Sequence, residues 1–189
     1  MTALPRFTLK VFLWLPVCFG VWYFVSILFA VPLASALDPL ITWLLPDLVQ
    51  GVMRRGNALL LIQRTAALGS EAALPVPAVA HPINPLIYGY GVPLYSALVL
   101  AAPGEDAVKM GRWMVGMLIL FLAQVFGLAT EILKDLTFGI EAARAQLNLS
   151  AFEYEMVALA YQLGYLILPP LAPILIWAMQ FRRQVADFR

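Results

Sequence analysis

Four long apolar stretches constrain the fold of this chain more than any other feature of its sequence. A helix rises 1.5 Å per residue and the hydrocarbon core of a bilayer is about 30 Å thick, so roughly 20 apolar residues can span it. Each stretch supplies close to that number, and they lie at about 10–36, 85–102, 113–130 and 156–181. We therefore expect an all-α membrane protein, with four transmembrane helices in a single domain.

The composition excludes several functional classes. Hydrophobic residues make up 62% of the chain and charged residues 12%, whereas a soluble domain carries about 25% charged residues. The net charge of +1 indicates no preference for nucleic acid, so the lipid bilayer is the first partner that we expect. Cys18 is the only cysteine, which excludes an intrachain disulfide and a cysteine-only metal site.

The first apolar stretch allows two interpretations. Arg6 and Lys10 precede it like the positive region of a signal peptide, and Ala34-Ser35-Ala36 matches a cleavage site. The apolar run is longer, however, than the roughly 7–15 residues of a signal-peptide core. We therefore interpret it as a retained membrane anchor.

The positively charged residues predict an orientation. Cytoplasmic loops carry an excess of lysine and arginine near the ends of transmembrane helices. With both termini on one side, that side also holds the basic residues nearest the helix ends: Lys10, Lys109, Arg112, Arg182 and Arg183. Most acidic residues fall on the opposite side, so we expect both termini in the cytoplasm.

The segment from about 37 to 84 would form a cap on the outer side of the membrane. Asp38 followed by Pro39 is typical of a helix start. The apolar residues that follow, including Trp43, predict a short helix that lies in the membrane interface, with the tryptophan at the level of the headgroups.

The rest of this cap carries strand signals. Gly56-Asn57 is a hairpin-turn signal between 49–54 and 58–65, so we expect a small β-hairpin there. The proline-rich stretch 69–82 favours an edge strand or an extended strap. An isolated hairpin is only marginally stable, so the cap must pack against the membrane, the helix ends or a partner.

The second outer loop, about 131–155, is expected to be helical. Ser150 and Glu153 fit a capping box, in which each side chain satisfies a backbone N–H of the other, and predict the start of the last helix. Three prolines in that helix, Pro169, Pro170 and Pro173, predict a kink.

Reactive residues are scarce. Cys18 and His81 could act as a nucleophile and base only within about 3 Å of each other, and we expect them at different depths of the membrane. A single His and a single Cys leave only carboxylates as further metal ligands, without a suitable spacing. We therefore assign no catalytic residue, metal ligand or cofactor.

Three polar residues mark the interior of the predicted bundle. Gln124 and Gln162 lie nearest mid-membrane, and Glu131 lies at the outer end of the third stretch. Such residues serve as hydrogen-bonding links between helices or line a transport path. We favour interhelical contacts for all three.

The most distinctive local sequence runs from His81 to Leu94. Asn84 can cap the second helix and Pro85 can begin it, while Tyr88 and Tyr90 suit the depth of the membrane interface. This segment is either a capped and kinked helix or an outer groove where a partner docks. The candidate partner contacts are Asn84, Pro85, Tyr88 and Tyr90, together with Trp43.

Several of these blocks resemble a known family. They are Phe12–Phe19, Asn84–Gly91, Tyr161–Gly164, Leu168-Pro169 and Leu171–Pro173, and they look like those of the exosortase H-associated membrane proteins. These are small bacterial multi-pass proteins linked to an exosortase, a transpeptidase-like membrane enzyme that processes proteins with a C-terminal sorting tag. The resemblance implies an accessory role in the inner membrane.

These expectations combine into a function. We expect a non-catalytic membrane protein that binds or supports an exosortase-type sorting enzyme or its tagged substrate. One alternative is a membrane-embedded cysteine peptidase or transpeptidase that uses Cys18 and His81. The other is a small transporter, in which Gln124 and Gln162 line the path.

Overall fold

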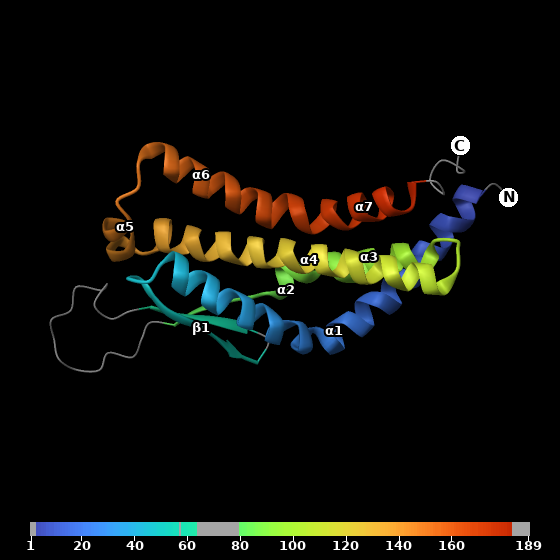
Figure 1. The fold of residues 1–189 in the computed structure, drawn as a ribbon, viewed down its shortest axis with the longest axis horizontal. Helices are drawn as coiled ribbons and strands as arrows, with labels where there is room; N and C mark the ends of the chain where they lie inside the picture. The colour runs from blue at the N-terminus through green and yellow to red at the C-terminus, as the bar shows by residue number, and fades with distance from the viewer. Residues whose placement is uncertain (1–2, 57, 64–79, 183–189) are drawn as a thin grey trace.

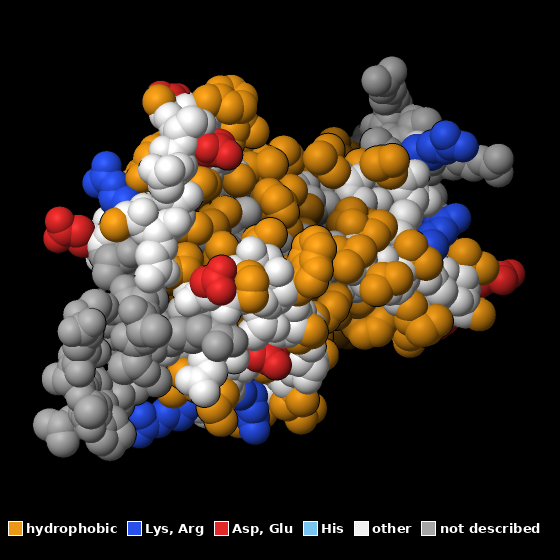
Figure 2. All heavy atoms as spheres, turned by 60° about the vertical axis from the view of Figure 1, so that its left-hand side comes forward, with side chains coloured by type: hydrophobic (Ala, Val, Ile, Leu, Met, Phe, Trp, Pro, Cys, Tyr) orange, Lys and Arg blue, Asp and Glu red, His pale blue; other side chains and the backbone are white. Residues whose placement is uncertain are grey.

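The computed structural model describes residues 3–56, 58–63 and 80–182, which form an elongated bundle of helices with a small sheet toward one end (Figure 1). The first helix, α1 (Ala3–Leu44), begins at the end of the molecule where the last helix stops, and leads to the sheet. We call these two ends the terminal end and the sheet end. Apolar side chains cover the middle of the bundle, and charged side chains gather toward its ends (Figure 2).

Among the residues that the structure describes, three helical stretches are long and apolar enough to cross a membrane. The first is Leu4–Leu44 of α1, and the second, Asp106–Gly139, joins α4 (Asp106–Lys134) to the π-helical turn η2 (Asp135–Gly139). The third, Ala151–Gln180, is built from α6 (Ala151–Gln162), the π-helical turn η3 (Leu163–Ile167) and α7 (Leu168–Gln180). They cover three of the four predicted spans.

The fourth span, expected at about 85–102, is not confirmed. Its residues form two shorter helices, α2 (Leu86–Gly89) and α3 (Gly91–Ala101). Together they cover Leu86–Ala101, a length of about 24 Å at 1.5 Å per residue, which is less than the ~30 Å of the hydrocarbon core. The helix cannot begin earlier because Ala80–Ile83 is held in the sheet as strand β3.

The separate interfacial helix expected after Asp38 is a wrong prediction. α1 continues through Pro39 to Leu44 without a break. Leu33, Leu37 and Ile41 are four residues apart and fully buried, so one continuous face of α1 packs into the core of the sheet end. This burial offsets the backbone hydrogen bond that Pro39 removes.

Asp38 has a different role from the helix cap that was expected. Its Oδ1 accepts a hydrogen bond from the backbone N–H of Val52 at 2.8 Å, which joins α1 to strand β1 (Val49–Arg55). Gly51 is small enough to permit this contact, since a Cβ there would lie 3.0 Å from the same oxygen.

The three strands form an antiparallel sheet in the order β1-β2-β3. Strand β2 (Ala58–Gln63) pairs with β1 through Val52 opposite Leu61, and with β3 through Leu60 opposite Pro82. The predicted hairpin is confirmed, and Gly56 adopts the positive φ of 63° that such a turn requires. The predicted edge strand is confirmed at 80–83, whereas 64–79 lie outside the described residues.

The second outer loop is interrupted rather than continuously helical. After η2 the chain forms α5 (Glu141–Leu147), and Asn148 then takes a left-handed conformation with φ of 41°. The capping box is confirmed: the Ser150 hydroxyl accepts from the Glu153 N–H, and the Glu153 carboxylate accepts from the Ser150 N–H at 2.7 Å. In the last span, the irregularity expected from the prolines takes the form of η3, directly before Pro169.

Candidate functional site

Tyr88 lies at the centre of the polar region near the sheet end. It is 3% exposed, and its ring lies over Gly127 of α4, where a Cβ would overlap the ring. The same ring meets Tyr165 edge to face, with centroids 5.9 Å apart. Gly127 also packs against Gly164 of η3. A Cβ on Gly164 would lie only 2.8 Å from the Gly127 Cα. Glycines at these two positions therefore let three helices meet around one tyrosine.

Glu131 lies one turn beyond Gly127 on α4, beside the Tyr88 hydroxyl. The Tyr88 Oη and Glu131 Oε2 atoms are both buried, and neither has a hydrogen-bond partner of good geometry within the described part of the chain. Buried polar atoms of this kind are uncommon, and each calls for an explanation.

Charged and aromatic groups extend this region along α4. The Lys134 ammonium forms an ion pair with Asp135 and lies 4.8 Å from the centroid of Tyr161. Tyr161 in turn stacks on Tyr165 at 5.3 Å. We call Tyr88, Glu131, Lys134, Asp135, Tyr161 and Tyr165 the tyrosine–carboxylate cluster. The hydroxyl, carboxylate and ammonium groups of this cluster can form hydrogen bonds and attract charged groups.

The predicted interhelical residues are placed unequally. Glu131 belongs to the cluster, and Gln124 is buried two turns earlier on α4, where it shares the wall of a small cavity with Tyr88. Gln162 is exposed on α6. The structure thus brings Gln124 and Glu131 near Tyr88, and leaves Gln162 on the surface.

The predicted partner contacts also separate into two groups. Asn84 is exposed, and its Oδ1 accepts from the Leu86 N–H at 3.1 Å, as expected of a residue that caps the helix. Trp43 is 79% exposed near the end of α1. Pro85 is buried and Tyr90 is half-buried, so with Tyr88 they belong to the packed interior.

The two reactive residues lie in different parts of the molecule. Cys18 is buried on α1 and lines a cavity between α1, α3 and α4. His81 lies in β3 opposite Leu61. Within residues 3–56, 58–63 and 80–182, no group of three or more His, Cys, Asp or Glu side chains is placed to hold a metal ion.

A hydrogen-bonded network at the terminal end was missed by the sequence reasoning. The Tyr95 hydroxyl donates to the carbonyl oxygen of Arg112 at 2.8 Å and lies 2.7 Å from Oε1 of Gln180. The Gln180 Nε2 donates to the same Arg112 carbonyl oxygen at 3.1 Å. The Arg112 guanidinium lies 4.7 Å from the centroid of Phe181. A buried tyrosine inside an apolar helix was the available signal, because its hydroxyl needs a partner.

Comparisons with known proteins agree with this architecture. A family model described as exosortase H-associated membrane protein matches residues 1–184, which is nearly the whole chain. Neither the curated proteins nor the solved structures include a match. The extent of the family match shows that the chain is a member of the exosortase H-associated membrane protein family.

Proposed function

We propose that this protein is a non-catalytic subunit of the bacterial inner membrane that binds an exosortase-type sorting enzyme, or its tagged substrate, at the sheet end. The observation that carries the proposal is the exposed Trp43 beside a folded sheet in a member of this family. The family description supports the association, and the sheet end supplies a surface for it.

The proposed contact surface consists of the exposed side chains Trp43, Met53, Arg54, Arg55 and Asn84. Trp43 is the next-to-last residue of α1, and Met53 is 59% exposed on β1 beside the two arginines. Tryptophan and arginine are the residues most enriched among those that dominate binding energies at protein interfaces. Trp43 and the arginines lie toward opposite ends of β1, so a membrane partner that contacts both types would cover the length of that strand.

Pro85, Tyr88 and Tyr90 contribute indirectly to this surface. Pro85 and Tyr90 flank α2, and the Tyr88 ring packs α2 against α4 and η3, so that Asn84 emerges at a fixed position next to β3. Both edges of the sheet are blocked against simple strand addition. Asp38 occupies the Val52 N–H of β1, and Pro82 has no N–H to offer from β3. Side-chain contacts therefore fit this surface better than a shared sheet.

The placement of the reactive residues supports a non-catalytic role. Cys18 lies among apolar side chains near the terminal half of α1, and His81 lies in the sheet. A cysteine nucleophile needs a base within hydrogen-bonding reach. We accordingly expect Cys18→Ala to support sorting as well as the unchanged protein does in a cell-based assay.

The distribution of basic residues supports an orientation with the terminal end in the cytoplasm. Five described basic residues lie at that end, namely Arg6, Lys10, Lys109, Arg112 and Arg182, together with only two described acidic ones, whereas the sheet end has four described basic residues and most of the acidic ones. Positive residues at the ends of membrane helices favour the cytoplasmic side. The sheet end would then face outward, where a sorting enzyme and its substrate would meet it.

Site-directed photo-crosslinking in native membranes tests this proposal. A benzoyl-phenylalanine residue is placed at Trp43, Met53 or Asn84, with the exosortase-type enzyme and a tagged substrate of the same bacterium carrying separate epitopes. We expect adducts with one of these two proteins at all three positions. Phe24 is the matched control, because it is 82% exposed in the middle of α1, away from the sheet.

Two results would contradict the proposal. One is the absence of both adducts at the three positions when the enzyme and substrate are present at normal levels. The other is an equal yield at Phe24, since this would indicate collisions within the membrane rather than a specific contact. Reporter fusions that place the two ends of the chain on different sides would separately exclude the proposed orientation.

A further inference from the structure

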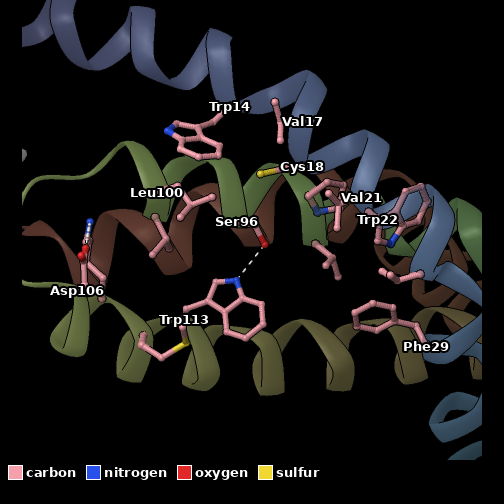
Figure 3. A pocket seen from close by; sticks show the side chains of 16 residues that line it. Trp14, Val17, Cys18, Val21, Trp22, Phe29, Ser96, Leu100, Asp106 and Trp113 are labelled. Atoms are coloured by element: carbon pink, nitrogen blue, oxygen red, sulfur yellow. Dashed lines mark hydrogen bonds and ion pairs between the residues drawn. The ribbon is translucent and has the colours of Figure 1, made fainter.

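A lateral groove opens between the first half of α1, α3 and the start of α4 (Figure 3). Its volume is about 650 Å³. Apolar and aromatic side chains form its walls, among them Trp14, Val17, Val21, Trp22, Leu100 and Trp113. The groove lies within the membrane-spanning part of the molecule, so its opening faces lipid rather than water.

The walls of this groove offer almost no free hydrogen-bonding groups. The Trp113 Nε1–H points across the groove and donates to the Ser96 hydroxyl oxygen at 2.9 Å (Figure 3). The Cys18 thiol behaves as a small hydrophobe, and the remaining polar groups on the apolar walls are the indole N–H groups of Trp14 and Trp22. A molecule inside the groove would therefore be recognised by its apolar surface and its shape.

Charge is confined to the mouth of the groove at the terminal end. There the Lys109 ammonium forms an ion pair of 2.8 Å with Asp106. The lysine side chain is only 17% exposed, whereas the aspartate is 96% exposed. An ion pair with one partner so open to solvent is weak, so another anion can replace the aspartate. A lysine at this depth reaches the headgroup level with its ammonium group.

The volume favours a lipid chain over a helix as the occupant. A methylene is about the size of a water molecule, whose share of the liquid is about 30 Å³, so a chain of about 16 carbons fills roughly 500 Å³. A helix about 10 Å across that rises 1.5 Å per residue fills roughly 120 Å³ per residue. The 650 Å³ groove matches one acyl chain but would enclose only about five helical residues.

We propose that this groove binds an anionic phospholipid of the surrounding bilayer, with one acyl chain between α1, α3 and α4 and its phosphate beside Lys109. The other basic residues of the terminal end add attraction for an anionic headgroup, while Glu105 and Asp106 oppose it. Basic pockets between helices on the cytoplasmic side are the usual binding sites for such lipids. The lipid would fill the space between the first helix and the rest of the bundle.

Native mass spectrometry of the full-length protein in detergent tests this site. The probes are palmitoyl-oleoyl phosphatidylglycerol and the matched phosphatidylcholine, titrated separately. We expect the protein to retain phosphatidylglycerol more tightly, and Lys109→Gln to weaken its binding about fivefold, as one lysine near a membrane surface would. Asp106→Asn should act in the opposite sense, because it frees Lys109 for the phosphate.

Variants of α1 test whether the acyl chain lies in the groove. Val21 lines the groove and is also more than half exposed, so Val21→Trp fills the space without disturbing the buried core. It should lower the retention of both lipids at least fivefold. Phe24→Trp is the control on the same helix, and Lys134→Gln is the control for the loss of one positive charge at the sheet end. Neither control should change retention.

The outcomes are distinguishable. Equal retention of the two lipids, or no effect of Lys109→Gln, would overturn the assignment of the headgroup. Unchanged retention in Val21→Trp would overturn the assignment of the chain. If Val21→Trp instead abolished crosslinking to the sorting enzyme and left lipid retention unchanged, the groove would hold a partner helix and this proposal would be wrong.

Discussion

The two ends of the helical bundle solve the same packing problem in different ways. At the terminal end Tyr95 lies over Gly116 of α4, and toward the sheet end Tyr88 lies over Gly127 of the same helix. The Tyr95 hydroxyl is satisfied by Arg112 and Gln180, whereas Tyr88 Oη has no well-formed partner within the described residues. The same packing of a tyrosine on a glycine therefore leaves the Tyr95 hydroxyl within a hydrogen-bonded network and the Tyr88 hydroxyl without a well-formed hydrogen bond.

This difference agrees with the roles that we propose. The closed network holds α3, α4 and α7 together next to the lipid groove. Gln63 Nε2 and Thr137 Oγ1 at the sheet end are also buried without a partner in the described part of the chain, whereas the terminal end has one such atom, Trp177 Nε1. Buried polar groups that are only partly satisfied cost stability, and proteins tolerate such violations mainly at functional sites.

The largest effect would come from breaking the feature that the two ends share. A methyl group at Gly116 or Gly127 would overlap a tyrosine ring, so each Gly→Ala variant should destabilise the protein by about 2–3 kcal/mol. Gly111→Ala is the matched control on α4, because its Cβ would meet nothing within 4 Å. It should stabilise the helix by up to about 1 kcal/mol. Denaturant unfolding in micelles measures all three, and equal effects would contradict the close packing.

A second variant should weaken the sheet end and leave the terminal end unchanged. Asp38→Ala leaves the Val52 N–H without its partner and should cost about 2 kcal/mol, because the lost hydrogen bond is charge-assisted. Asp38→Asn keeps an acceptor and should cost less. Hydrogen exchange should rise in β1 and stay unchanged in α7. Asp47→Ala, at an exposed neighbouring position, is the control, and a comparable rise in that variant would show that the link does not matter.

A pair of Tyr→Phe variants sharpens the comparison most directly. Tyr95→Phe removes a hydroxyl with good partners and should destabilise the protein by about 1.5 kcal/mol. Tyr88→Phe removes a hydroxyl without such partners and should change stability by less than about 0.5 kcal/mol. Thermal unfolding in the same detergent compares the two. A large loss in Tyr88→Phe would mean that this hydroxyl is bonded to Glu131 after all.

The smallest effect concerns only the start of the last membrane-spanning stretch. Glu153→Ala removes half of the capping box and should cost about 0.5–1 kcal/mol. Glu155→Ala has the same change of charge two residues later and should be nearly neutral. Circular dichroism during thermal unfolding can detect the difference. Equal midpoints for the two variants would remove the capping box as a source of stability.

Two of the features that were predicted correctly depend on neighbouring residues alone. The hairpin follows from the Gly56 turn, and the start of α6 follows from Ser150 and Glu153. Each of these two signals acts over a few residues and agrees with the packing around it, whereas the equally local Asp38-Pro39 signal was overridden by the burial of α1. The span expected at about 85–102 was not confirmed. Its length depends on where β3 ends, and β3 exists only through pairing with β2. Tyr88 and Glu131 were both proposed from the sequence, but for separate roles, and only the folded chain places them beside each other.

The sequence by itself determined that this is a membrane protein, because apolar runs of sufficient length have few other stable environments. It also determined the turn and the helix cap, whose partners lie within three residues. Only the tertiary structure decided that α1 continues through Pro39, that Tyr88 and Tyr95 each lie on a glycine, and that a groove remains beside α1. These features depend on the shapes of surfaces far apart in the chain, whose contact no local pattern specifies.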